Sequence, residues 1–549
     1  MAIHFADIWE SVARALPEKP ALADLGDGKG KTKHASWREY EDRAARLAQA
    51  LLAQGIQAHD KVGLYTYNRA EHLVAQFACY KLRAIPFNVN YRYLEDELVY
   101  LLDNAEAKGI VFEGTFAPRL AAILSKLPKL KVMIEIADGE GHLPGALDYE
   151  SLIRERAPLP PIARSEEDTY MLYTGGTTGL PKGVGYPMGV ITRNMLRGYE
   201  FMGVPIPQSS EELGQRVKEF AESGMLRVSL PACPLMHGTG MWGGVYMPHN
   251  MGGSVVLFKN RPFDPHLLWR AVEQEKVTDI AIVGDAFAKP MVKALDEAKA
   301  SGRPYDISSL ERIVSSGVMW SAETKERLLE YGALTLMDGM GSTEGVMGFQ
   351  ITTRDYRPKT GTFFLLPTAK ILKDNDEEAR PGEVGMIAIT EGLPKGYYKD
   401  EKKTGMTFRT IGGVRYGFPG DYARVEEDGS IFLLGRGSVC INTGGEKVFP
   451  EEVEEAIKTH PLVEDCLVTG VPDEALGERV AAVVAHTPGH PVSEKELQAH
   501  VHGRLAGYKA PKHVIFVEHI MRGPNGKGDY KWARETAREI IALEEAKPH

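Results

Sequence analysis

From residue 37 onward, segments with the apolar spacing of helices alternate with short apolar runs typical of strands. Residues 37–55 repeat apolar positions every three or four residues, residues 61–67 form a short apolar run, and residues 69–85 return to the helical spacing. The alternation continues to residue 138 and resumes beyond residue 170. Such an order favours a largely parallel sheet covered by helices. We therefore predict an α/β fold.

The length of the chain indicates more than one domain. A chain of 549 residues is too long for one hydrophobic core, so we expect a large N-terminal domain of sheets covered by helices and a small α+β C-terminal domain. An Asp-Gly turn between two apolar runs in residues 426–438 predicts a β-hairpin that leads into a linker. We place the domains at 1–436 and 437–549. Residues 207–227 are polar, charged and helix-prone, and we interpret them as a surface insertion.

Composition excludes several classes of protein. The net charge of -10 includes no long basic block, which argues against a nucleic-acid partner. Cys79, Cys233, Cys440 and Cys466 are scattered and form no C-x-x-C pair, so neither a zinc site nor a disulfide framework is indicated. No run approaches the ~20 apolar residues of a membrane span, and the first residues lack a signal-peptide core. We expect reduced thiols and a cytoplasmic location, and the sequence leaves a homodimer open.

The segment YTGGTTGLPKGVGYP, residues 173–187, has the chemistry of a phosphate-binding loop. It follows an apolar, β-prone run and holds five glycines, three threonines and one lysine, Lys182. Glycines let the backbone approach closely, so that amide groups can face an anion, while threonine and lysine add donors. Lys182 lies between Pro181 and Gly183, so the Walker A pattern fails. The segment is either a polyphosphate loop of another kind or a flexible surface loop.

The same segment closely resembles the signature loop of the adenylate-forming superfamily, which comprises acyl-CoA synthetases, adenylation domains and luciferases. The other motifs of that superfamily follow in the expected order over nearly the entire chain. The family usually has Ser where this chain has Gly175. In this loop the resemblance implies ATP contacts from Thr174, Gly175, Gly176, Thr177, Thr178, Gly179 and Lys182.

Four further motifs imply the remaining nucleotide and metal contacts. Residues 315–320, SSGVMW, match the loop that lies against adenine, and Thr343 and Glu344 match a pair whose hydroxyl meets phosphate and whose carboxylate holds Mg²⁺. Asp421 and Arg436 occupy the ribose-binding positions. Without the resemblance, Glu344 would be an ordinary surface acid. The contacts implied by these motifs are Ser316, Gly317, Asp338, Gly339, Met340, Gly341, Ser342, Thr343, Asp421 and Arg436.

The C-terminal domain carries the motifs that the family uses after nucleotide binding. Lys527 matches the catalytic lysine, although a lysine on an exposed turn is unremarkable by itself. Ser438 occupies the hinge position, which is frequently Asp or Lys. The resemblance implies that residues 437–549 rotate between two reaction steps. The rotation would withdraw Lys527 and bring Gly444, Gly445 and Glu446 toward the pantetheine of CoA.

The implied activity is that of an AMP-forming acyl-CoA synthetase that uses ATP, Mg²⁺ and CoA, with Lys182, Glu344 and Lys527 as catalytic residues. Within the family the motifs look most like those of bacterial synthetases for bulky hydrophobic acids, including steroid side-chain and fatty acids. Two alternatives stay open: an adenylation enzyme that loads a carrier protein, and a non-catalytic nucleotide-binding relative.

A set of apolar and aromatic residues forms the candidate acyl pocket. The same side chains could equally be core, and a lone histidine among them is more often a packed residue than an acid or base. We assign His237 to the substrate wall and not to proton transfer. The candidate residues are Met236, His237, Trp242, Val283, Phe287, Trp320 and Met340.

Overall fold

The structure is a computed structural model that describes residues 4–174, 180–259, 262–318, 320–443, 446–473, 476–523 and 526–545. The chain divides into two compact units. The first is Met1–Val346, Gln350–Thr360 and Glu391–Phe408, and the second is Met347–Phe349, Gly361–Thr390 and Arg409–His549. Residues 409–436 thus pack with the C-terminal segment, on the other side of the predicted boundary. This division reports packing and not motion, so the boundary at residue 436 stays a prediction.

The first unit begins with the predicted parallel sheet, in the order β4-β3-β5-β6-β7. Ser36 starts the first covering helix with a capping box, in which its hydroxyl accepts from the Glu39 amide. The strands are β3 (Lys61–Tyr65), β4 (Ile85–Asn88), β5 (Ala107–Glu113), β6 (Val132–Ile136) and β7 (Leu147–Asp148). The helices are α2 (Trp37–Ala53), α3 (Ala70–Lys81), α4 (Glu95–Asn104), η1 (Gly114–Phe116), α5 (Ala117–Ile123), η2 (Leu124–Lys126) and α6 (Tyr149–Glu155).

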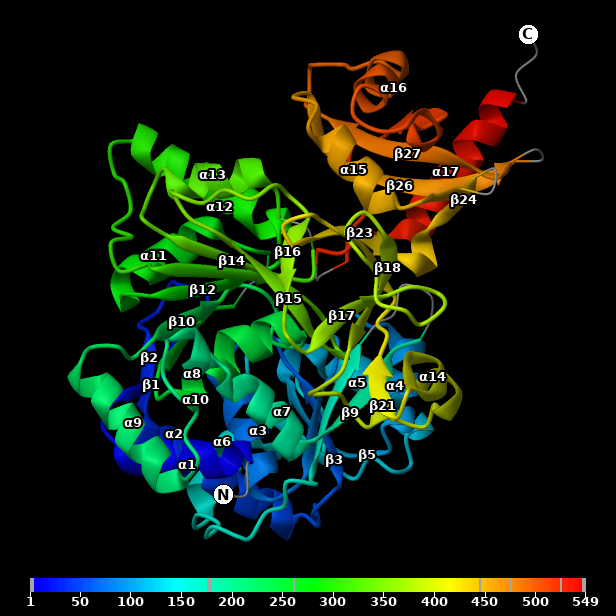
Figure 1. The fold of residues 1–549 in the computed structure, drawn as a ribbon. Coiled ribbons are helices and arrows are strands. Elements are labelled where there is room, and N and C mark those ends of the chain that lie inside the picture. The colour runs from blue at the N-terminus through cyan, green and yellow to red at the C-terminus, as the bar shows by residue number, and fades with distance from the viewer. Residues whose placement is uncertain are drawn as a thin grey trace. The chain divides into compact units, whose positions relative to one another are not determined.

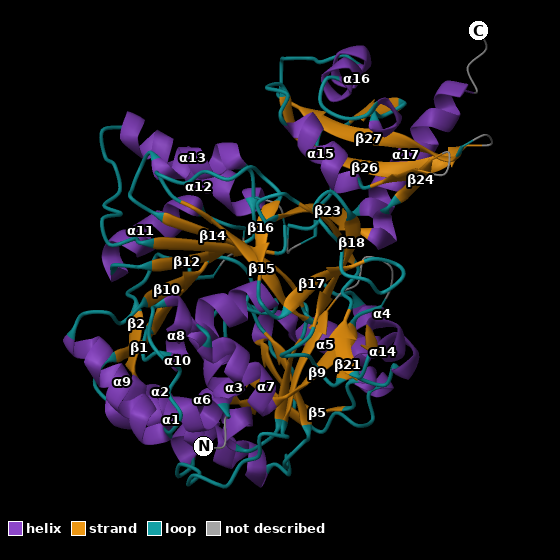
Figure 2. Cartoon of the chain, viewed as in Figure 1, coloured by secondary structure: helices purple, strands orange, loops and turns teal. Residues whose placement is uncertain are grey.

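A second sheet of this unit runs in the order β2-β1-β11-β10-β12-β13-β14 and is parallel except at β2. In Figure 2 helices lie on both of its sides, as the sequence pattern predicts. The strands are β1 (Pro20–Asp24), β2 (Lys33–Ser36), β10 (Val228–Pro231), β11 (Ser254–Leu257), β12 (Asp279–Ile282), β13 (Arg312–Ser316) and β14 (Thr335–Ser342). The helices that follow its strands are α11 (Pro265–Glu275), α12 (Asp285–Ala300) and α13 (Ala322–Leu329).

A small antiparallel sheet, β19-β9-β8, carries the glycine-rich segment. Its strands are β8 (Thr169–Thr174), β9 (Lys182–Pro187) and β19 (Gly396–Tyr397). The helices of this region are α7 (Met188–Leu196), α8 (Gly198–Phe201), the π-helical η3 (Thr239–Tyr246), α10 (Met247–Asn250) and α14 (Glu401–Thr407).

Helices α1 (Phe5–Ala15) and α9 (Ser210–Glu222) pack against each other, and Figure 1 shows both at one end of the first unit. Helix α9 lies within residues 207–227, the segment interpreted as a surface insertion, and one face of this helix is buried. That the segment is an insertion stays an interpretation. Leu213, Val217 and Phe220 recur at helical spacing and are buried in the main core of the unit. The charged residues that suggested an insertion belong to the opposite, exposed face.

The second unit contains the predicted hairpin and the predicted α+β segment. The hairpin pairs β22 with β23, with Val425 opposite Ile431. Strand β15 (Gly345–Thr352) is shared between the units. The remaining strands are β16 (Thr362–Leu365), β17 (Ala369–Leu372), β18 (Val384–Ile389), β20 (Phe408–Ile411), β21 (Val414–Gly417), β22 (Asp421–Val425), β23 (Ile431–Arg436), β24 (Ile441–Thr443), β25 (Glu446–Val448), β26 (Val463–Asp473), β27 (Gly477–His486) and β28 (His513–Phe516). The helices are η4 (Gly437–Val439), α15 (Pro450–Lys458), α16 (Glu494–His502), η5 (Gly507–Lys509) and α17 (Tyr530–Glu545).

The cysteines and the lengths of the helices complete the description of the fold. Cys79, Cys233 and Cys466 are buried thiols outside any disulfide. Within the described ranges, every helix is too short or too polar to cross a membrane.

Candidate active site

The strands on either side of the glycine-rich loop bring its two ends together. Strand β8 ends at Thr174 and β9 begins at Lys182, and these two residues are direct partners in the antiparallel register. The five predicted ATP contacts between them, Gly175, Gly176, Thr177, Thr178 and Gly179, lie outside the described residues. The flanking strands therefore define where the loop begins and ends, and Lys182 is fixed at its exit.

Lys182 forms an ion pair within the first unit. Its Nζ lies 2.6 Å from Oδ2 of Asp400 and 5.9 Å from the centre of the Tyr397 ring. The hydrogen bond from Lys182, aided by that of the Lys403 amide, lowers the pKa of Asp400 below its usual value. The side chain of Lys182 is 38% exposed, so its ammonium can still reach a ligand.

Glu344 lies in the turn between β14 and β15, where the Thr-Glu motif was predicted. Its amide donates to Oγ of Ser342 at 3.1 Å, and the Tyr186 hydroxyl donates to the carbonyl of Thr343 at 2.9 Å. The Tyr397 hydroxyl donates to Oε1 of Glu344. These bonds fix the turn and direct one oxygen of the Glu344 carboxylate.

The predicted adenine-side residues lie on two neighbouring parallel strands. Ser316 at the end of β13 is paired with Gly339 on β14. Gly317 follows with φ of +93°, a conformation that favours glycine. The Asp338 side chain is buried, and its carboxylate forms an ion pair with Lys325, whose Nζ lies 3.3 Å from Oδ2. Burial raises the pKa of Asp338 to about 6, although the nearby Lys325 lowers it. Backbone atoms of this strand therefore suit a nucleotide contact better than the Asp338 carboxylate does.

Asn88 organises the loops around the site, and sequence reasoning did not select it. Asn88 lies at the end of β4, and its side-chain Nδ2 donates to the backbone carbonyls of Tyr173 and Met236, each at 2.8 Å. Its Oδ1 accepts from the backbone amide of Tyr173 at 2.7 Å. One side chain thus joins the strand before the glycine-rich loop to the segment that contains His237. The available signal was a single polar residue that ends an apolar strand.

The candidate acyl residues fall into two groups. Val283, Phe287 and Trp320 belong to the buried core around α11, α12 and α13, and Trp320 is fully buried. Their position favours the packing alternative for these three. His237 and Trp242 are partly exposed, and the Trp242 indole donates to the Tyr170 hydroxyl at 2.7 Å. Trp242 lies in the π-helical η3, a form often found at functional sites. The buried Met236 and Met340 complete the predicted set.

In the second unit, the predicted ribose-binding residues lie opposite each other. Asp421 begins β22, Arg436 ends β23, and the Arg436 Nε lies 3.4 Å from Oδ1 of Asp421. Oδ2 of Asp421 is buried and has no hydrogen-bond partner within the described part of the chain. A buried carboxylate oxygen without a donor is costly, and a ribose hydroxyl would satisfy it.

The other predicted residues of the second unit lie on turns. Lys527 is half-buried, and its carbonyl accepts from the Gly523 amide at 2.7 Å in a tight turn. Ser438 lies in η4, immediately after the hairpin, and Glu446 begins β25 and is exposed. Gly444 and Gly445 lie outside the described residues. The assigned roles of these residues stay predictions.

The carboxylates present fit a magnesium ion that completes its shell with phosphate and water. Within the described ranges, no three His, Cys, Asp or Glu side chains gather into a metal-binding set. Mg²⁺ bound together with nucleotide needs only one or two carboxylates. Glu344 is the residue that would hold it, because within the described residues the Tyr397 hydroxyl donates to Oε1 and the other carboxylate oxygen could face the ion.

The chain belongs to the family of AMP-binding enzymes. The family model described as AMP-binding enzyme matches residues 9–398, and the model described as AMP-binding enzyme C-terminal domain matches residues 452–527.

The relatives and a solved structure agree with this assignment. The chain is 41% identical to a 3-oxocholest-4-en-26-oate–CoA ligase of Rhodococcus rhodochrous, over 97% of this chain and 96% of the relative. It is 40% identical to a medium/long-chain-fatty-acid–CoA/3-oxocholest-4-en-26-oate–CoA ligase of Mycolicibacterium smegmatis, over 99% of this chain and 98% of the relative. Its structure resembles that of ATP-bound MatB from Rhodopseudomonas palustris, with a TM-score of 0.80 and 25% sequence identity, over 97% of this chain and 99% of MatB. The predicted superfamily and fold class are confirmed.

Proposed function

We propose that the protein is an AMP-forming acyl-CoA ligase for hydrophobic carboxylic acids, namely steroid side-chain acids and medium- to long-chain fatty acids. The observation that carries the proposal is the convergence of Lys182 and Glu344 on Tyr397, beside a glycine-rich loop, in a chain about 40% identical to ligases of these acids. Its substrates are the acid, ATP and CoA.

The reaction has two steps. In the first, a carboxylate oxygen of the acid forms a bond to the α-phosphorus of ATP, and the bond to pyrophosphate breaks. In the second, the sulfur of CoA forms a bond to the carbonyl carbon of the acyl-AMP, AMP leaves, and the thiol gives up its proton. Neither step needs a protein nucleophile.

Positive charge must offset the repulsion between two anions in the first step. Lys182 is partly exposed at the exit of the loop, which suits it to the leaving phosphates. Glu344 would hold Mg²⁺, which neutralises phosphate charge when bound. We assign the carboxylate and the α-phosphate to Lys527, and the ribose to Asp421 and Arg436. We further infer a rotation of residues 437–549 between the steps and a cytoplasmic location.

A screen of acids tests the proposal. Purified protein is given ATP, Mg²⁺, CoA and one acid from a panel of steroid, terpenoid, aromatic and C6 to C18 acids, and AMP release is measured. We expect the steroid and longer fatty acids to give the highest kcat/KM. A holo carrier protein that replaces CoA as the better acceptor would favour the carrier-loading alternative. No AMP with any acid would favour the non-catalytic one.

A further inference from the structure

We propose that Tyr397 and Asp400 are positioning residues that hold Glu344 and Lys182 ready before the nucleotide binds. The proposal rests on the function given above and adds two residues that none of the sequence motifs identified. Tyr397 ends β19 and Asp400 is the N-cap of α14, three residues later, and both are far in sequence from the charges that they contact.

The segment is fastened to the strand that begins at Lys182. Gly396 and Tyr397 pair with Gly185 and Val184 in antiparallel register. Backbone bonds of 2.7 Å extend the pairing on both sides, from the Lys395 amide to Gly185 and from the Tyr398 amide to Gly183. The position of Tyr397 relative to Lys182 is therefore set by a ladder of backbone hydrogen bonds and not by side chains alone.

Tyr397 holds Glu344 through its hydroxyl. The phenol donates to Oε1 of the carboxylate, a charge-assisted bond that fixes the side-chain rotamer. Other contacts hold Tyr397 in place. The centre of its ring lies 6.1 Å from that of the Phe408 ring, and the backbone amide of Tyr397 donates to Oγ1 of Thr404 at 2.9 Å. Removal of the hydroxyl alone would release the carboxylate and leave the ring in place.

Asp400 holds Lys182 by an analogous arrangement. It is the N-cap of α14, and its Oδ1 accepts from the Lys403 amide at 2.9 Å. Its Oδ2 is thereby directed to Nζ of Lys182 at 2.6 Å. An ammonium has three donors, so Lys182 can keep Asp400 and still donate to phosphate oxygens. A lysine that is already ordered loses less rotamer entropy when the nucleotide binds.

The next residue, Tyr398, provides a matched control. Successive side chains of a strand point to opposite faces, and the Tyr398 hydroxyl donates instead to Oε2 of Glu106 at 2.7 Å. Glu106 is also paired with Lys129 and Lys399 and carries no predicted role. Tyr397→Phe and Tyr398→Phe therefore each remove one hydroxyl that donates to a glutamate, and only the first glutamate is predicted to hold metal.

The experiment compares wild type, Tyr397→Phe, Asp400→Asn and Tyr398→Phe. Calorimetric titration with α,β-methylene-ATP, with Mg²⁺ and with EDTA, gives the factor by which magnesium improves nucleotide affinity. Partners that orient a metal ligand typically contribute about 10-fold or more to metal affinity. We expect Tyr397→Phe to reduce that factor about 10-fold, and Asp400→Asn to weaken binding severalfold both with Mg²⁺ and with EDTA. Tyr398→Phe should change neither.

Acid-dependent pyrophosphate exchange against free Mg²⁺ supplies the second readout. Tyr397→Phe should raise the Mg²⁺ concentration for half-maximal exchange by a similar factor, with the KM for the acid and the thermal midpoint unchanged. Equal magnesium dependence of Tyr397→Phe and Tyr398→Phe would overturn the role of Tyr397. Wild-type nucleotide affinity in Asp400→Asn would overturn that of Asp400. If wild type shows no exchange with any acid, the proposed function fails, and the calorimetric comparison still decides the positioning roles.

Discussion

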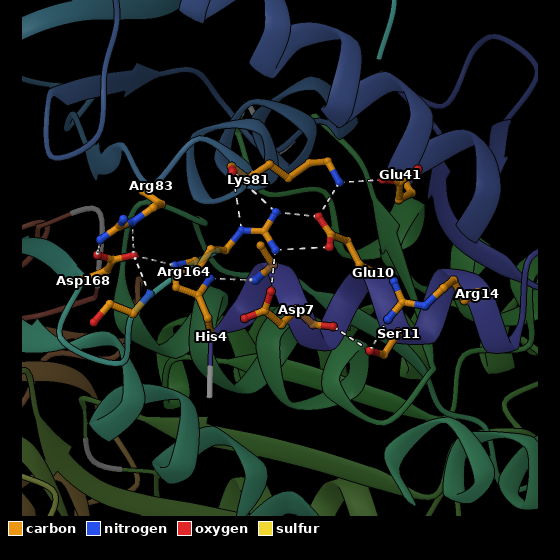
Figure 3. Close-up of polar contacts among 12 residues, drawn as sticks. His4, Asp7, Glu10, Ser11, Arg14, Glu41, Lys81, Arg83, Arg164 and Asp168 are labelled. Carbon is orange, nitrogen blue, oxygen red and sulfur yellow. Dashed lines mark hydrogen bonds and ion pairs between the residues drawn. The ribbon is translucent and has the colours of Figure 1, made fainter. Parts of the chain in front are cut away.

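The first unit contains two networks of charged side chains that differ in burial. Arg164, in the segment before β8, forms a network of ion pairs with Asp7 and Glu10 of α1, Glu41 of α2 and Lys81 of α3, as Figure 3 shows. Around Tyr397, the side chains of Lys182 and Glu344 each form one side-chain hydrogen bond within the described residues, and both are partly exposed. The Arg164 side chain is 1% exposed and that of Lys182 is 38% exposed. We infer that the same residue types stabilise the fold where they are buried and, as proposed for Lys182 and Glu344, bind ligands where they are partly exposed.

At the centre of the buried network, Glu10, Lys81 and Arg164 each have two partners of opposite charge. Arg164 donates to Asp7 and to both carboxylate oxygens of Glu10, at 3.1 and 2.7 Å, and Lys81 bridges Glu10 and Glu41 at 2.7 and 2.5 Å. Burial raises the pKa of Glu10, but the hydrogen bonds and charges of Arg164 and Lys81 outweigh it, so that the net pKa is lowered. The network joins the N-terminal helix to the core, and its central side chains, Arg164, Lys81 and Glu10, are 1%, 1% and 6% exposed.

The largest effect is expected from Arg164→Met. Removal of Arg164 takes the ion-pair partner from Asp7 and leaves the buried Glu10 with Lys81 alone, and the loss of one partner of a buried ion pair typically costs about 3–5 kcal/mol of unfolding free energy. Denaturant unfolding measures it, and kcat per folded molecule should stay at the wild-type value. Arg14→Met is the control, because Arg14 is exposed and its guanidinium donates to the neutral Oγ of Ser11 at 2.8 Å. A loss below about 1 kcal/mol for Arg164→Met would remove the contrast between the networks.

Lys182→Met should show the opposite pattern. The loss of a charge that stabilises a transition state typically costs about 100-fold or more in rate, so acid-dependent pyrophosphate exchange should fall by that factor. The unfolding free energy should change by less than about 1 kcal/mol, because the ion pair with Asp400 is partly exposed. Lys395→Met, which removes a surface pair with Glu167 at 3.1 Å, should affect neither quantity. A large loss of unfolding free energy together with wild-type pyrophosphate exchange would show that Lys182 stabilises the fold and does not act in the reaction.

The smallest effect concerns the pH dependence of stability. Burial and then the charge of Arg164 lower the pKa of His4 to about 3, with Asp168 opposing at 3.7 Å. Below pH 6.5 the unfolded chain takes up a proton at His4 that the folded chain does not, so stability falls as pH falls from about 6.5 to 3. His4→Asn keeps an N-cap acceptor for the Ala6 amide and removes this titration.

Between pH 6.5 and 5 the loss of unfolding free energy should be about 1.5 kcal/mol smaller in His4→Asn than in wild type. Denaturant titrations at the two pH values measure the difference, and the buried His72 and His249 are common to both proteins. Parallel pH profiles would show that His4 is protonated in the folded state, contrary to its burial.

The sequence predicts the fold well where periodicity decides it. Alternating helical and strand segments predict the parallel sheets, and the Asp-Gly turn predicts the pairing of β22 with β23. The charges of residues 207–227 favour a surface segment, and the sequence alone does not show that the apolar face of α9 packs against α1 and the core.

The sequence predicts which motifs belong to the candidate site, but it does not predict which side chains contact one another there. Lys182 and Glu344 stand in recognisable segments, whereas Asp400 is 218 residues from Lys182 and Tyr397 is 53 from Glu344. No local pattern pairs residues over such distances. The Arg164 network cannot be predicted for the same reason. In addition, the sequence suggests that Glu10 and Lys81 face solvent on their helices, whereas the structure buries both.

The measurement that tests the account most directly separates the two partial reactions in Lys527→Ala. Acid-dependent exchange of labelled pyrophosphate into ATP reports acyl-AMP formation, and conversion of supplied acyl-AMP with CoA reports thioester formation. We predict that Lys527→Ala lowers the exchange about 100-fold or more and leaves thioester formation within a few-fold of wild type. Full pyrophosphate exchange by Lys527→Ala would contradict the assignment of the first step to this lysine.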